Sequence, residues 1–92
     1  MKTTPRVQNM RSDNSGREIA NQFEIFTDEG KYYQSYSTIV AFRDNNGNVT
    51  LDRNKWDYSR TTGKYRNQFL GETKKETERK IASGEYTLAD LN

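Results

Sequence analysis

A short basic and aromatic stretch in the second half of the chain holds the side chains best suited to binding a ligand. Between residues 53 and 66, five cationic residues are interleaved with three aromatic ones. Proteins bind single-stranded nucleic acid with these groups: cations follow the phosphates and rings stack on the bases, each stacked base contributing ~1–3 kcal/mol. The candidate binding residues are Arg53, Lys55, Trp56, Tyr58, Arg60, Lys64, Tyr65 and Arg66.

The same residue types allow two other interpretations. In a chain with few aliphatic side chains, Trp56 and Phe69 can belong to the core, and the arginines then solvate its rim. Arg, Trp and Tyr also dominate the binding energy of protein–protein interfaces. The stretch matches no named nucleic-acid-binding signature. A nucleic-acid surface, a core with a solvated rim and a protein-binding patch therefore stay open.

The composition removes most catalytic and metal chemistry. The chain has no cysteine and no histidine, which excludes disulfides, thiolate nucleophiles and the usual zinc sites, and removes the commonest general base. The acids Asp28, Glu29, Asp44 and Asp52 fall at expected turns or strand ends, where such residues are ordinary. No phosphate-binding G-x-x-x-x-G-K-[ST] loop occurs. We therefore predict no enzymatic activity, no cofactor and no metal.

Charge is uneven along the 92 residues. Residues 53–70 hold five cations and one anion, whereas residues 20–52 hold two cations and five anions. A binding partner could sense this asymmetry. No apolar run reaches ten residues, so we expect neither a signal peptide nor a membrane span, and a cytoplasmic location.

The first half of the chain predicts a β-meander. Residues 1–18 lack a hydrophobic period and are predicted to be a flexible N-terminal arm, followed by a single domain over residues 19–92. Alternating apolar residues and turn signals over 21–52 predict three or four antiparallel strands. We expect a turn at Gly30, a bend or bulge in a long strand near residues 35–38, and a type I′ turn at Asn46-Gly47.

The second half predicts one or two short helices. Asn54 could cap a helical turn over residues 55–59. Residues 64–70 fit a helix or a strand, and we favour a helix opened by Thr61 or Thr62 and closed by Gly71. Thr73 and Glu76 form a capping box for a helix that ends at Gly84. Tyr86 and Leu88 are expected to return to the sheet, which gives an α+β fold.

The alternating pattern also predicts which side chains are buried. Because Ile39 and Ala41 alternate with Val40 and Phe42, we expect one of these two sets to be partly exposed; if it is the aromatic set, a homodimer could form there. The predicted core is Phe23, Ile25, Ile39, Ala41, Val49, Leu51, Trp56, Phe69, Ile81 and Leu88.

The string "WDYSRTTGKYRNQFLGET", followed by a charged helix, resembles short uncharacterised proteins of tailed bacteriophages, and the likeness covers residues 21–92. The resemblance implies a protein that acts in an infected bacterial cytoplasm by binding something there. Two functions follow as expectations. The first is a non-enzymatic module that contacts nucleic acid or a nucleoprotein through residues 53–66. The second is an inhibitor of a host or defence protein, which uses the same face or the acidic meander over 24–52.

Overall fold

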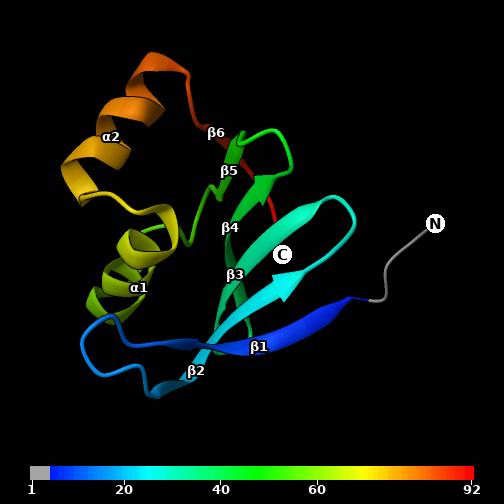
Figure 1. Ribbon diagram of the computed structural model, residues 1–92. Coiled ribbons are helices and arrows are strands. Elements are labelled where there is room, and N and C mark those ends of the chain that lie inside the picture. The colour runs from blue at the N-terminus through cyan, green and yellow to red at the C-terminus, as the bar shows by residue number, and fades with distance from the viewer. Residues whose placement is uncertain (1–4) are drawn as a thin grey trace.

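Six strands in sequence order form one sheet, and two helices lie on one side of it (Figure 1). This α+β arrangement comes from a computed structural model that describes residues 5–92. Neighbouring strands are antiparallel, except that the last strand runs parallel to the fifth. The elements are β1 (Arg6–Arg11), β2 (Glu18–Phe26), β3 (Gly30–Ser35), β4 (Thr38–Asp44), β5 (Val49–Asp52), α1 (Arg60–Leu70), α2 (Lys74–Ser83) and β6 (Thr87–Ala89).

The predicted flexible arm is wrong for residues 6–11, which form β1. This strand pairs with β2, with Val7 opposite Ile25, and it places Met10 in the core with 2% of its surface exposed. Backbone pairing and one buried side chain order a segment that has no hydrophobic period. The predicted break near Gly16 is the turn of a hairpin, in which Gly16 has φ +71°. Residues 1–4 of the predicted arm lie outside the described residues.

The meander over 21–52 is confirmed with four strands, although two of its turns differ from the prediction. The long strand with an expected bend is two strands, β3 and β4, which reverse at Tyr36 with φ +56°. The turn before β5 has positive φ at Gly47 and not at Asn46, so it is not type I′. The Asp44 carboxylate accepts hydrogen bonds from the backbone N–H groups of Asn46 and Asn48, each at 2.9 Å. These bonds stabilise a turn that differs from type I′.

Both predicted helices are confirmed, and residues 64–70 are helical. The residue that caps α1 is Ser59, whose hydroxyl accepts the Thr62 N–H, and Gly71 ends the helix in the left-handed region. The predicted helical turn over 55–59 is absent: residues 53–57 form successive turns. α2 has the predicted capping box of Thr73 and Glu76. Within residues 5–92 no helix is long and apolar enough to cross a membrane.

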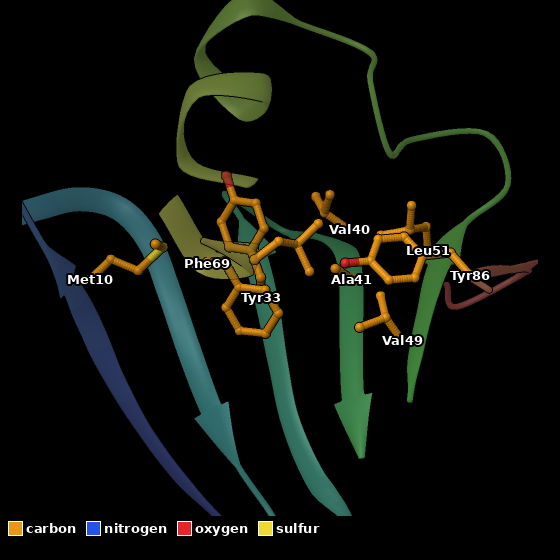
Figure 2. Close-up of a cluster of buried hydrophobic side chains, with 9 residues drawn as sticks. Met10, Tyr33, Val40, Ala41, Val49, Leu51, Phe69 and Tyr86 are labelled. Carbon is orange, nitrogen blue, oxygen red and sulfur yellow. The ribbon is translucent and has the colours of Figure 1, made fainter. Parts of the chain in front are cut away.

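The core lies between the helix-facing side of the sheet and α1. Figure 2 shows Tyr33, Val40 and Phe69 meeting there. The alternating pattern predicts that Val40 and Ala41 belong to two alternating sets, one of which is partly exposed, and this prediction is wrong for these two residues. Both are fully buried, because the β3–β4 register is irregular at this point. The buried hydrophobic residues are Met10, Tyr33, Val40, Ala41, Val49, Leu51, Phe69, Leu70 and Tyr86, with Trp56, Ile81 and Leu88 packed partly buried against them.

Three residues of the predicted core lie on the opposite face. They are Phe23, Ile25 and Ile39, which pair in register with Tyr32 or Gln34 of β3. Successive residues of a strand point to opposite faces. Tyr33 and Ser35 of β3 point to the helices and are fully buried, so Tyr32, Gln34 and their partners point away from the helices. Alternation along a strand identifies two faces but does not say which of them a helix covers.

Candidate nucleic-acid interface

A groove of about 630 Å³ opens at the N-terminal end of α1. The segment before the helix, its first two turns and the start of α2 form the walls. The first turn of α1 contains no acidic residue, and the carboxylate that lines the groove near the positive end of the helix dipole is that of Asp57, from the segment before the helix. The lining residues are Asp57, Tyr58, Ser59, Arg60, Gly63, Lys64, Arg66, Asn67 and Lys74.

Four of the five predicted cations lie on the surface. Arg60 and Lys64 line the groove, Lys55 is exposed in the preceding turns, and Arg53 is exposed beside β6, where its Nη2 donates to the Leu88 carbonyl at 3.5 Å. Lys55 Nζ lies 5.3 Å from the centroid of the Tyr58 ring. Among the ion pairs of residues 5–92, none involves any of these four cations. They are therefore available to an anionic ligand.

Arg66, the fifth predicted cation, is not on the binding surface. Only 1% of its surface is exposed. Its Nη1 donates to the Trp56 carbonyl at 2.7 Å and to Asp57 Oδ1 at 3.0 Å, and its Nη2 donates to Asn67 Oδ1 at 2.9 Å. The guanidinium also lies 5.1 Å from the centroid of the Trp56 ring. Arg66 thus holds residues 56–57 against α1 and forms the floor of the groove.

Asp57 links this floor to α2. Its Oδ2 lies 2.7 Å from Lys74 Nζ, while its Oδ1 receives Arg66. Burial acts to raise the pKa of Asp57, but the hydrogen bonds from Lys74 and Arg66 outweigh it and hold the pKa below its usual value. Asp57 is therefore ionised at neutral pH and offsets one of these two positive charges. Arg60 and Lys64 line the groove without a carboxylate partner among residues 5–92 and add to its positive charge.

The predicted aromatic residues are not equally accessible. Tyr58 lines the groove and is 42% exposed. Trp56 and Tyr65 are partly buried and pack against the core, so the core interpretation holds in part for both. Tyr58 is the most exposed of the three, and it is the residue on which a base or another planar group could stack.

Sequence reasoning missed the contribution of α2 to the groove. Lys74 is the first residue of α2 and reaches Asp57 because only residues 71–73 separate the two helices. The capping box at Thr73 predicts where α2 begins, but it does not predict that the first residue of α2 lies beside α1. Within residues 5–92 no group of three or more Asp or Glu side chains could hold a metal ion. The arrangement is suited to binding an anion.

No curated protein and no solved structure matches the chain. A family described as "Family of unknown function (DUF8033)" matches residues 6–85, which include all of the groove. The match also starts at the first residue of β1 and includes both helices. The chain belongs to the DUF8033 family of unknown function.

Proposed function

We propose that the protein is a non-enzymatic module that binds single-stranded nucleic acid in the groove at the start of α1. The observation that supports this most is the exposed Tyr58 ring beside cations that have no carboxylate partner among residues 5–92. A ring for bases together with unpaired cations for phosphates is the combination that sequence-tolerant binding of single strands needs.

Each group has a distinct role in this proposal. Arg60 and Lys64 flank the N-terminal end of α1, where free backbone N–H groups and the helix dipole favour a phosphate. Tyr58 stacks on one base. Lys55, which lies beside the Tyr58 ring, and Arg53 receive the next phosphate along the strand. Arg66 and Asp57 contact no ligand and keep the groove in shape.

The bacteriophage resemblance supplies the proposed setting. A phage-encoded module of this kind would act in the host cytoplasm on nucleic acid or on a nucleoprotein formed during infection. The resemblance names no catalytic residue, and the absence of cysteine and histidine from the chain supports a binding role over an enzymatic one.

The test is a titration of fluorescently labelled single-stranded DNA and RNA oligonucleotides, read by anisotropy. We expect micromolar binding at low salt and a log–log salt slope of roughly −2 to −3, since each of about three or four phosphate contacts contributes ~0.7 for single strands. Duplex DNA should bind more weakly, because its bases are not free to stack on Tyr58.

Two variants locate the binding site. The double substitution Arg60→Glu with Lys64→Glu should weaken binding at least tenfold, and Tyr58→Ala should reduce the preference for single strands. The matched control is Arg6→Glu with Arg17→Glu, which changes charge equally at exposed positions outside the groove. Absence of binding at about 50 mM salt, or equal binding by the two charge-reversed proteins, would contradict the proposal.

The second candidate is an inhibitor of a host or defence protein. Tyr58 and the exposed arginines are residue types that dominate protein–protein interfaces, and this observation favours it. An inhibitor would show no affinity for nucleic acid alone and would co-purify with one stoichiometric host protein. That complex should be lost in Tyr58→Ala.

A further inference from the structure

The centre of the sheet face opposite the helices is uncharged and largely apolar. One row of paired residues crosses all six strands, and a second row crosses four. We call these ten residues the open sheet face, and none of them is charged. They are Val7, Ile25, Tyr32, Phe42, Thr50 and Thr87 in the first row, and Asn9, Phe23, Gln34 and Ile39 in the second.

No helix of residues 5–92 covers this surface, since both lie on the other side of the sheet (Figure 1). Val7 is 60% exposed. Tyr32 and Phe42 are half-buried, and their ring centroids lie only 4.4 Å apart, so they shield one another sideways. Ile25 lies between Val7 and Tyr32 in the same row. The centre of the face is thus a continuous apolar strip.

At the centre of the sheet, the charged side chains lie on the face that the helices share, which is the reverse of the usual arrangement. In an antiparallel sheet with one face in water, polar residues occupy the wet face and apolar residues the covered one. Here the rows that share the side of the helices include the cations Arg6, Lys31 and Arg43 and the anion Glu24, whereas on the open side charged residues such as Arg11, Glu18 and Asp52 lie at the ends of the strands. This distribution indicates that the open face is covered in the working protein.

We propose that the open sheet face packs against the same face of a second copy of the chain. A two-fold interface brings a surface against itself, and a face without charge meets no like charge when it does so. Two twisted sheets can pack in this way at about 10 Å. A nucleic acid would need cations for its phosphates, which this face lacks. The inference goes beyond the proposed function and rests on different residues.

The size of the face predicts a weak dimer. Six strands spaced by about 4.8 Å and about six residues long give a sheet of roughly 24 by 20 Å, or about 500 Å² in projection. Stable interfaces begin near 600 Å² of accessible surface per partner. The dimer should therefore dissociate in the micromolar range and be populated only at higher protein concentration.

The test is sedimentation velocity of the full chain from about 1 to 200 μM. We expect the mass to rise from the 10.8 kDa of one chain to twice that value. Phe42→Lys places a charge in the first row and should keep the protein monomeric at 200 μM. Thr61→Lys adds the same charge at an exposed position of α1 that does not line the groove and is the matched control, which should dimerise like the unchanged protein. Circular dichroism and thermal unfolding confirm that each variant is folded.

The outcomes are distinct. A monomer of the unchanged protein at 200 μM would overturn the proposal. A folded Phe42→Lys variant that dimerises normally would also overturn it. Tyr32→Lys, in the same row, gives a second check if Phe42→Lys does not fold. None of these results depends on nucleic-acid binding, so failure here is separate from failure of the proposed function.

Discussion

Replacement of Arg66 by methionine gives the sharpest test of how the groove is built. The substitution keeps the aliphatic part of the side chain and removes a guanidinium that is 1% exposed and makes three hydrogen bonds. The Trp56 carbonyl and the Asn67 side chain each lose the hydrogen bond from Arg66. Asp57 keeps Lys74 and is 30% exposed, which limits the loss.

The expected loss follows from these contacts. Removing one partner of a buried ion pair costs about 3–5 kcal/mol, and we take roughly 3 kcal/mol because Asp57 keeps its second partner. For a domain of this size, that corresponds to a fall in Tm of about 12–24 °C. A small domain has only about 5–15 kcal/mol of stability in total, so the variant should be markedly unstable.

The assay is equilibrium unfolding in urea followed by far-UV circular dichroism, since Trp56 fluorescence would itself change with the substitution. Arg60→Met is the matched control: the same replacement at an exposed position of the same helix should change the unfolding free energy by less than about 0.5 kcal/mol. If Arg66→Met costs less than about 1 kcal/mol, the guanidinium is not held as described and could serve as a surface cation after all.

Two further predictions concern the α2 junction and the β2–β3 turn. Glu72, with 4% of its side chain exposed, receives Lys80 Nζ at 2.8 Å and the Tyr86 hydroxyl at 2.7 Å. Burial acts to raise the pKa of Glu72, but these hydrogen bonds and the one from Thr77 lower it overall. A carboxyl whose pKa is lower in the folded state stabilises the fold above its unfolded pKa of about 4.3 and loses that contribution as the pH falls. Glu72→Gln should therefore cost about 2 kcal/mol at pH 7 and flatten the decline of stability between pH 5 and 3, and an unchanged acid decline would refute this. Gly30→Ala should cost at least about 2 kcal/mol in urea unfolding, because its Cβ would lie 2.2 Å from the Arg43 carbonyl oxygen at φ +152°. Gly47→Ala, at φ +90° with no atom within 4 Å, is the control and should cost about 1 kcal/mol less.

The elements that sequence predicts well are those with a local cause. The capping box of Thr73 and Glu76 fixes the start of α2 through bonds within one helical turn, and Gly71 ends α1 because glycine readily adopts positive φ. Such signals need no knowledge of the rest of the chain. β1 had no such signal, because its order comes from pairing with β2 and from the burial of Met10.

The burial of Arg66 had a local signal that the sequence interpretation did not use. Once residues 60–70 are taken as a helix, Arg66 lies one turn from Thr62 and one turn from Phe69 and Leu70, and all four are buried. Because arginine is mostly exposed in proteins, residue type alone predicts that Arg66 lies on the surface with the other cations of the basic stretch. Helical spacing would have separated Arg66 from Arg60 and Lys64. Two of its acceptors, in residues 56–57, come from a turn that the sequence does not predict.

Because Arg66 is buried whereas Arg60 and Lys64 are exposed, the binding proposal has to be tested with variants that leave Arg66 unchanged. A charge reversal that includes Arg66 would abolish binding by unfolding the groove, and the loss would be mistaken for a lost phosphate contact. Reversal of Arg60 and Lys64 alone changes the exposed charge and leaves the buried guanidinium and Asp57 paired. Only this design connects a loss of affinity to the surface of the groove.

The two proposed surfaces lie on opposite sides of the sheet, and this makes the proposals independent in a measurable way. α1 carries the groove on one side, while the row from Val7 to Thr87 lies on the other. In the proposed dimer both grooves face outward and stay open, so a saturating short oligonucleotide should bind once per chain in monomer and dimer alike. Phe42→Lys should then bind a short oligonucleotide as tightly as the unchanged protein, but lose the extra affinity that two linked grooves give for a strand long enough to span both.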